Sequence, residues 1–359
     1  MKIETDDSFY RTDDGNYQRS SAIKTFESCS WSYYCNYVLK IPQKDNIGAL
    51  MGNVCHSFFE CMLHARHKKH HAKIVKAGTV NAVPSTSRLV RKLIARNKLP
   101  NDQKTFTKID NMILVGLKTD FYVKGAKIVG NEHRFKFKEE DPSKPKYNIY
   151  GTIDKVAVNK NEVIIDDFKS SKLKYSGEDK DAGVQALMYS LACKKLWPDK
   201  KVKVRFVFLQ YPDEPTQEVE FTDAQLKGFE HYLEAMQQKI DSFTERDAHR
   251  NFAADKGIPA DGSFGGTLAC GFAKRPGQLK KDGSPMWHCP YKFAFTYYAV
   301  MEDNKTIKTY LNYDDIKLKE GQTIQLREYL GCPRFRDAVA DVPATPIFKP
   351  NTKNVLDDF

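Results

Sequence analysis

The sequence lacks any long apolar run, and this absence argues against a protein with membrane-spanning helices. No stretch approaches the roughly 18 consecutive apolar residues that a membrane-spanning helix needs. The opening segment MKIETDDSFYRTDDGNYQRS is polar and acidic, and it has no apolar core of the kind that a secretory signal carries. We therefore expect no membrane association and a cytoplasmic location, which would be the host cytoplasm if a phage encodes the chain.

Internal repeats and long low-complexity tracts are also missing, as is a Walker phosphate-binding loop of the form G-x-x-x-x-G-K-[S/T]. ATP-driven movement along a polymer would therefore need another chain. Acidic residues are in the minority, because 57 Lys and Arg against 46 Asp and Glu leave a net charge of +11. Such an excess favours a polyanionic partner such as nucleic acid, and the alternative is a basic protein without such a partner.

The chain does have enough hydrophobic material for a large core. Its 359 residues are 41% hydrophobic and 12% aromatic, which suits one elaborated domain with added parts. We predict an α/β fold with a mixed central sheet flanked by helices. The predicted parts are a flexible arm over 1–20, a helical N-terminal subdomain over 21–127, a core with a cysteine-bearing closing segment over 128–300, and a small C-terminal appendage and tail over 301–359.

Hydrophobic periodicity and turn residues place the individual elements. Helices are predicted over 21–40, from 47 to about 73, near 86–97 and 104–124, over about 181–197 and over about 222–247. Strands are predicted in the runs IVGNEHRFKFKEE, YNIYGTIDKVAV, EVIIDDFKS, VKVRFVFLQY and TQEVEFT. The turn Asn159-Lys160-Asn161 joins the second and third of these strands, so we expect that pair to be antiparallel.

The run YNIYGTIDKVAVNKNEVIIDDFKSS carries residues suited to hydrolysis. Alternation along a strand puts Asp167 and Lys169 on one face and Asp166 on the other, and a tight hairpin can bring Asp154 to the same patch. Two carboxylates can hold Mg²⁺ or Mn²⁺ and leave open positions for water and substrate. A neighbouring lysine can neutralise charge that develops on a phosphate. An Asp-x-Lys pair by itself is more often a solvated pair at a strand end, so its surroundings decide between the two.

Those surroundings resemble a known family. Gly151-Thr152-Ile153-Asp154 and the later run from Ile165 to Ser171 resemble the G-x-(I/V)-D … (I/V)-(I/V)-D-(F/Y)-K-(T/S) core of RecB-like nucleases in the PD-(D/E)xK superfamily. This family includes helicase–nuclease subunits, CRISPR-associated RecB-like exonucleases and phage exonucleases. Further segments resemble its other motifs in the same order over about residues 20–300, namely Ser21 to Tyr37, Gly52 to Glu60 with His56, Glu132, and Gln185 to Tyr189.

The resemblance implies a restriction-endonuclease-like fold and a set of site residues. It implies His56, Asp154, Asp167 and the backbone carbonyl of Phe168 as ligands of Mg²⁺ or Mn²⁺. Lys169 would be the catalytic lysine, and Gln185 and Tyr189 would position DNA or that lysine. Taken alone, His56 and Tyr189 are also consistent with ordinary core residues.

The implied activity is metal-dependent hydrolysis of single- or double-stranded DNA, of the exonuclease kind, in recombination, repair or phage DNA processing. A helicase, a single-strand-binding protein or a polymerase is an expected partner. Three alternatives remain open. They are a catalytically silent DNA-binding module of the same fold, a phosphodiesterase that acts on RNA, and a subunit whose main role is to bind a helicase.

Eight cysteines in a chain expected to stay in a reducing compartment indicate thiols or metal ligands. Some members of the family hold a 4Fe–4S cluster with one early cysteine and a late C-x-x-C-x-x-x-x-x-C pattern. Cys29 stands at the early position, but eighteen residues separate Cys270 from Cys289 instead of two, and Phe295 stands where the third late cysteine would fall. Four ligands could be completed by Cys332, Cys35 or His288, or the thiols could be buried remnants of a lost cluster.

Basic residues gather on the predicted helices before the strands. The histidines at positions 64, 67, 70 and 71 follow helical spacing and could bind a metal, although a solvated basic face explains them better. That face is a candidate DNA-binding surface or a plain solvated surface. Its other members are Lys68, Lys69, Lys73, Arg88, Arg91, Lys92 and Arg96.

Overall fold

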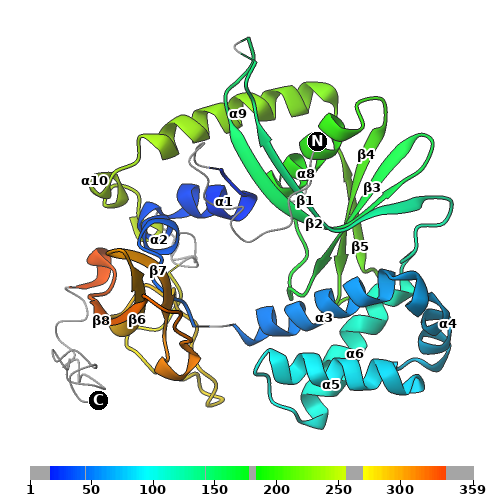
Figure 1. Ribbon diagram of the computed structural model, residues 1–359, viewed down its shortest axis with the longest axis horizontal. Helices are drawn as coiled ribbons and strands as arrows, with labels where there is room; N and C mark the ends of the chain where they lie inside the picture. The colour runs from blue at the N-terminus through cyan, green and yellow to red at the C-terminus, as the bar shows by residue number, and fades with distance from the viewer. Residues whose placement is uncertain (1–16, 45, 142, 178–182, 256–269, 337–359) are drawn as a thin grey trace. The chain divides into compact units, whose positions relative to one another are not determined.

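The computed structural model describes residues 17–44, 46–141, 143–177, 183–255 and 270–336 (Figure 1). Most of the predicted N-terminal arm and the end of the predicted tail lie outside these residues. The chain divides into two compact units. The first combines residues up to Ser20 with Asp45–Asp241, and the second combines Ser21–Lys44 with residues from Ser242 onward. The part boundaries that we predict from the sequence stay a prediction.

The first unit is built on a five-stranded mixed sheet, as predicted. Its strands are β1 (Lys127–Lys138), β2 (Asn148–Val158), β3 (Glu162–Lys169), β4 (Lys201–Phe208) and β5 (Thr216–Glu220), in that spatial order. The pairs β1–β2, β2–β3 and β4–β5 are antiparallel, whereas β3 and β4 are parallel. Parallel neighbours need a long crossover, and helix α8 (Val184–Leu196) lies in that connection.

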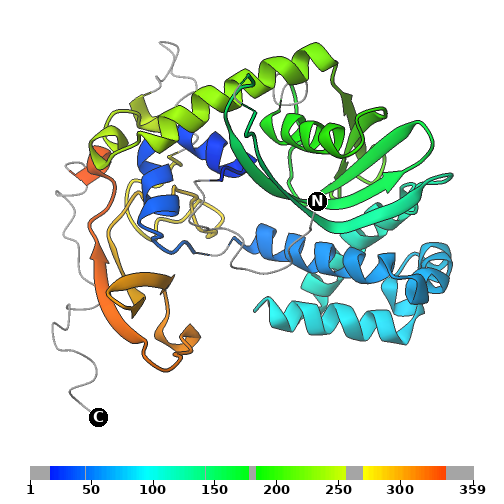
Figure 2. The same ribbon diagram turned by 45° about the horizontal axis from the view of Figure 1, so that its top comes forward.

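Helices cover both faces of this sheet. On one face lie α3 (Ile47–Leu63), α4 (Lys68–Ala77), α5 (Pro84–Arg96) and α6 (Gln103–Lys118), whose apolar residues form one core with Phe168, Val207 and Leu209. Helix α8 packs on β4, and α9 (Asp223–Asp241) packs on α8 (Figure 2). The prediction of a mixed sheet flanked by helices is therefore confirmed.

Three predicted helices of this unit are shorter than expected. The helix predicted over 104–124 ends at Lys118. The helix predicted from residue 47 to about 73 ends at Leu63, because His64 is extended with φ −67° and ψ 136°, and a 3-10 turn precedes α4. The helix predicted to end near residue 247 ends at Asp241. After Leu63 and after Asp241 the amphipathic pattern of the sequence continues, so this pattern does not indicate where either helix ends.

The second unit begins with α1 (Ser20–Ser28), α2 (Ser30–Tyr33) and a π-helical turn over Tyr34–Val38. The single helix predicted over 21–40 is therefore wrong. Cys29 interrupts it in an extended conformation, where its Sγ accepts a hydrogen bond from the Ser32 backbone N–H (3.4 Å) and caps α2. The short helix α10 (Glu245–Ala248) also belongs to this unit.

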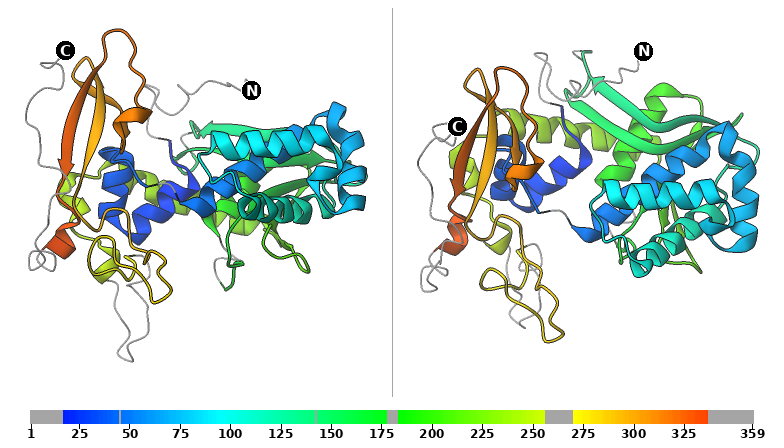
Figure 3. Two further views of the ribbon diagram at one scale, coloured as in Figure 1. Left: turned by 90° about the horizontal axis from the view of Figure 1, so that it is seen from below. Right: turned by 60° about the horizontal axis from the view of Figure 1, so that its bottom comes forward.

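A three-stranded antiparallel sheet completes the second unit (Figure 3). Its strands are β6 (Phe295–Glu302), β7 (Lys305–Tyr310) and β8 (Thr323–Tyr329), in the spatial order β7-β6-β8. Tyr297 and Tyr329 from this sheet share a core with Trp31. Residues 301–329, part of the predicted C-terminal appendage, include the end of β6 and all of β7 and β8. Within the described residues, no helix is long and apolar enough to cross a membrane.

Candidate functional site

The site forms where two strands of the first unit part. Strands β2 and β3 pair from Val158 opposite Val163 as far as Lys155 opposite Asp166. One step further, the backbone N–H of Phe168 donates to Oδ2 of Asp154 at 2.7 Å. A side-chain carboxylate thus accepts a bond that a strand carbonyl would accept in a continued ladder. This bond fixes the Asp154 carboxylate at the point where the sheet opens.

The residues of β3 alternate as the sequence predicts. Lys169 and Asp167 share a face, with Lys169 Nζ 2.6 Å from Oδ2 of Asp167. Asp166 lies on the opposite face, where it forms ion pairs with Lys155 and Arg205. One carboxylate of the Asp166-Asp167 pair therefore faces the site, and the other belongs to the structural core beneath it.

A side chain of helix α8 forms hydrogen bonds with both Asp167 and Lys169. Lys169 Nζ donates to Oε1 of Gln185 (2.8 Å), and Nε2 of Gln185 donates to Oδ1 of Asp167 (2.9 Å). The same Nε2 lies 2.8 Å from the hydroxyl of Tyr189, which donates to the Thr152 carbonyl on β2 at 2.8 Å. One amide side chain thus contacts both members of the pair, and Tyr189 ties that amide to the neighbouring strand.

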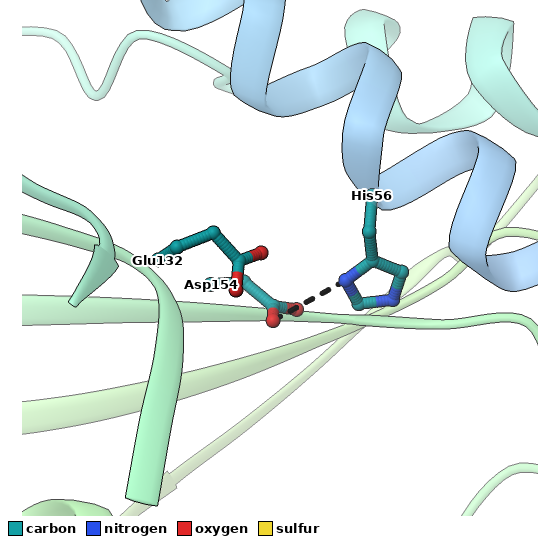
Figure 4. Close-up of side chains that lie close together, drawn as sticks. All are labelled: His56, Glu132 and Asp154. Atoms are coloured by element: carbon teal, nitrogen blue, oxygen red, sulfur yellow. Dashed lines mark ion pairs between the residues drawn. The ribbon is translucent and has the colours of Figure 1, made fainter. Parts of the chain in front are cut away.

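A second group of side chains converges at Asp154. His56 reaches it from α3, with Nδ1 3.3 Å from Oδ1 of Asp154. Glu132 reaches it from β1, where Asn131 pairs with Lys155 and His133 pairs with Ile153, so that Glu132 stands opposite Asp154. One ligand atom from each of His56, Glu132 and Asp154 lies within 4.8 Å of the others (Figure 4).

Glu132 lies in a segment whose sequence resembles a family motif, but the sequence did not lead us to expect it at the metal site. Its backbone has φ +50°, a conformation that a non-glycine residue rarely adopts, and a register shift of β1 lies between Ile128 and Gly130. The β1–β2 register, which a single sequence does not reveal, is the signal that would have found it. Local backbone strain of this kind is typical of functional sites.

Negative charge dominates this group, and the titration of its members follows from that. Burial and then the Asp154 carboxylate raise the pKa of Glu132 to about 7. Burial lowers the pKa of His56, but Asp154 and the neighbouring carboxylates outweigh it and raise that pKa to about 9. Burial also raises the pKa of Asp167, against the opposing effect of Lys169. Protons on His56 and Glu132 therefore offset part of the negative charge of the carboxylates that converge here.

The donor set fits a divalent cation. Two carboxylates and an imidazole gathered within 4.8 Å offer oxygen and nitrogen ligands of the kind that Mg²⁺, Mn²⁺ or Zn²⁺ accepts. Of the predicted ligands, His56 and Asp154 are in this set, whereas the Asp167 carboxylate lies beside it, held by Lys169 and Gln185. The Phe168 ring packs in the core, 4.3 Å between centroids from Phe59, and a ligand role for its carbonyl stays a prediction.

The second unit brings distant cysteines to one cavity. Cys29 from the start of α2, Cys270 and Cys289 from the loop region, and Cys332 after β8 all line a cavity of about 320 Å³. The Cys289 N–H donates to the Cys270 carbonyl (3.0 Å). All four are free thiols. Of the three candidates for a fourth ligand, the structure brings Cys332 to the cavity, while Cys35 Sγ instead donates to the Tyr329 hydroxyl (3.7 Å).

The spacing of these thiols bears on what could bind there. A tetrahedral zinc ion holds its sulfur atoms roughly 3.8 Å apart, given Zn–S bonds of about 2.3 Å. Among the described residues, the cysteine sulfurs form no group of three within 4.8 Å of one another. The buried Lys292, whose Nζ donates to the Gly271 carbonyl (3.3 Å), lies close enough to act electrostatically on three of the thiols. Among the described residues, these sulfur atoms are therefore not spaced as in a tetrahedral zinc site.

The predicted basic surface lies on α4 and α5 of the first unit. From Cys61 to Asn101 the chain contains ten Lys and Arg and no Asp or Glu. His71 is not one of its solvated members, because its Nε2 lies 2.8 Å from the Leu117 carbonyl. Within the described residues, the histidines here form no metal-binding group. The exposed cations of this surface are Arg66, Lys68, Lys69, Lys73, Lys76, Arg88, Arg91, Lys92, Arg96 and Lys98.

One comparison with known proteins agrees with this arrangement. A sequence model described as the PD-(D/E)XK nuclease superfamily matches residues 20–260. No curated protein matches the chain. Among solved structures, one described as "Crystal structure of SSO0001" is 13% identical, covers 60% of this chain and 87% of that chain, and has a TM-score of 0.24. The last likeness is too low to carry an argument.

Proposed function

We propose, on the premise that the chain belongs to the PD-(D/E)XK nuclease superfamily, that it is a metal-dependent deoxyribonuclease of the RecB-like branch. Nucleases of this superfamily use divalent metals and act on DNA. The observation that carries the proposal is the convergence of His56, Glu132 and Asp154 beside the Asp167–Lys169 pair. A silent DNA-binding protein would have no physical reason to retain such a costly cluster of like charges.

In this proposal, His56, Glu132 and Asp154 would hold the cation, and the Asp167 carboxylate would lie beside it. When bound, the cation supplies positive charge against the phosphate oxygens and lowers the pKa of water. Mg²⁺ and Mn²⁺ are the expected ions, because carboxylate oxygens dominate the set. These residues would have to be deprotonated to hold the ion.

The other residues keep an ammonium group in place. Lys169 is held by Asp167 and Gln185, so its charge is fixed before substrate arrives. Fixed charge needs no reorganisation during the reaction, and it neutralises the phosphate as negative charge develops. Tyr189 acts through Gln185 as a positioning residue, since its hydroxyl contacts the amide and the Thr152 carbonyl.

The test is a cleavage assay on end-labelled single- and double-stranded DNA with Mg²⁺, with Mn²⁺ and with chelator. We expect Asp167→Ala and Lys169→Ala to lose cleavage by a factor on the order of 10³ and to keep DNA affinity in chelator. Lys203→Ala is the matched control, because Lys203 forms partly exposed ion pairs with Glu218 and Glu220 away from the site. Equal loss of affinity and cleavage in a folded variant would show that the site is misassigned, and a preference for RNA would contradict the substrate.

We further propose exonucleolytic action in recombination, repair or phage DNA processing. A helicase, a single-strand-binding protein or a polymerase would present the DNA end, because the sequence has no Walker loop of its own. The basic surface on α4 and α5 would contact the phosphates. Replacing Arg88, Arg91 and Lys92 together should weaken DNA binding and reduce its dependence on salt, whereas an unchanged salt dependence would leave this surface merely solvated.

The four cysteines support a second proposed cofactor, a 4Fe–4S cluster held by Cys29, Cys270, Cys289 and Cys332. Cysteine thiolates are the usual ligands of such clusters, and the buried Lys292 would offset part of the negative charge. The test is the ultraviolet–visible spectrum and iron content of anaerobically purified protein. Cys332→Ser should lose both, and Cys61→Ser, which lies in the first unit, should keep both. Zinc in place of iron would contradict the cluster.

A further inference from the structure

A loop directly after the catalytic strand holds an apolar side chain out in water. Leu173 follows Lys169 by four residues, and 78% of its surface is exposed. It stands between Lys172 and Lys174 in the run Ser170-Ser171-Lys172-Leu173-Lys174-Tyr175. Single exposed apolar residues are common and need no explanation. The setting of this one is different, because the structure fixes the backbone around it.

Hydrogen bonds hold the start and the middle of this loop in place. At its start, the Ser170 hydroxyl donates to the Gly48 carbonyl (3.3 Å) and the Ser170 carbonyl accepts from Nε2 of Gln210 (2.5 Å). In the middle, the Ser171 hydroxyl donates to the carbonyl of Leu173 itself (2.8 Å), and the Lys172 carbonyl accepts from the Tyr211 hydroxyl (2.5 Å).

The end of the loop is held equally well. The Tyr175 N–H donates to Oε1 of Gln217 (3.2 Å), and Nε2 of Gln217 donates back to the Tyr175 carbonyl (3.1 Å). The Tyr175 ring packs edge-on against Phe206 and Phe208 of β4. Several hydrogen bonds therefore hold in place a segment that leaves a leucine in solvent.

The junction with α3 places this loop at the site. Gly52 lies one turn before His56, and a methyl group built on it would come 2.6 Å from the Ser170 hydroxyl oxygen. The loop thus leaves the site at the point where α3 meets the end of β3. Leu173 lies on a hydrogen-bonded backbone between two lysines, of which Lys174 lies over the Tyr211 ring and 3.8 Å from Glu214. This arrangement has the chemistry of a contact with nucleic acid, in which lysines contact phosphates and an apolar side chain contacts a base face.

We propose that Leu173 contacts a nucleobase of the DNA strand bound at the site, next to the scissile phosphate, while Lys172 and Lys174 contact the flanking phosphates. This inference rests on the proposed function. It adds to that function a residue that positions the DNA strand relative to the site. Because apolar contact with a base face does not depend on base identity, the contact should act on any sequence. It should disappear wherever the base itself is missing.

The test is a scan of single-stranded oligonucleotides that each carry one abasic position, with affinity measured by fluorescence anisotropy in chelator. For the unmodified protein, an abasic nucleotide at one or two adjacent positions should weaken binding about tenfold. Leu173→Ala should weaken binding to the intact oligonucleotide by a similar factor and should show no further loss at those positions. Leu279→Ala, which removes a leucine that is 56% exposed in the second unit, is the matched control.

The outcomes separate this inference from the function on which it rests. If the protein binds and cuts DNA but Leu173→Ala keeps the abasic profile of the unmodified protein, the inference is overturned and the proposed function stands. If the unmodified protein neither binds nor cuts DNA, both are overturned. If Leu173→Ala loses affinity equally at every position, the side chain acts on the loop rather than on a base, and the inference again fails.

Discussion

The buried ion pairs beneath the site predict that the two partners of one pair, Asp166 and Lys155, contribute unequally to stability. Lys155 and Asp166 are the residues next to Asp154 and Asp167, and their side chains are 0% and 1% exposed. Lys155 Nζ also donates to the Phe121 carbonyl (2.5 Å). Arg205 holds the same carboxylate through two N–H groups, at 2.5 and 2.8 Å. Asp166 therefore pairs with two cations, whereas among the described residues Lys155 forms an ion pair with Asp166 alone.

Removing the carboxylate should cost much more than removing the lysine. Asp166→Leu leaves Lys155 buried without an anion, and breaking a buried pair in this way costs about 3–5 kcal/mol. Lys155→Met leaves Asp166 in its two bonds with Arg205 and removes one donor from the Phe121 carbonyl, at a cost of about 1–3 kcal/mol. At about 2–4 °C per kcal/mol for a unit of this size, Asp166→Leu should lower the melting temperature by roughly 6–20 °C.

The assay is thermal unfolding by calorimetry, with the transition of the first unit followed separately. Lys203→Met on the same strand as Arg205 is the control and should change stability by less than about 1 kcal/mol, because its ion pairs are partly exposed. A loss in Lys155→Met equal to or larger than that in Asp166→Leu would refute the reasoning. It would mean that Arg205 does not compensate the carboxylate.

Three further predictions concern the site. Gln185→Leu removes the amide that contacts Asp167 and Lys169, so kcat for DNA cleavage should fall about 10- to 100-fold with DNA affinity unchanged; an equal loss of affinity would point to a contact with DNA instead. His56→Ala should weaken Mn²⁺ binding, measured by calorimetry, by about 10- to 100-fold without unfolding the protein, and unchanged binding would exclude the imidazole as a ligand. Raised pKa values, about 7 for Glu132 and about 9 for His56, mean that protons compete with the cation as pH falls. Mn²⁺ affinity should therefore rise at least about tenfold between about pH 6 and pH 8, and less so in Glu132→Gln.

Strand alternation and turn chemistry are local properties of the chain. The sequence by itself therefore determined the strand pairing and the side-chain faces that depend on them. The sequence predicted the antiparallel pairing of β2 and β3 from the Asn159-Lys160-Asn161 turn, and the structure has it. The faces of Asp166 and Asp167 followed from the two-residue repeat of a strand. The mixed sheet flanked by helices followed from the order of the elements, and the family match agrees with it.

Only the tertiary structure decided which groups meet across long separations. Glu132 joins His56 and Asp154 because of the β1–β2 register, and Cys332 joins three other cysteines because β8 returns the chain to their cavity. The break of the first helix at Cys29 has the same origin, since helical periodicity continues through it. Register, chain return and helix ends are fixed by packing between distant segments, and a single sequence carries no local signal of such packing.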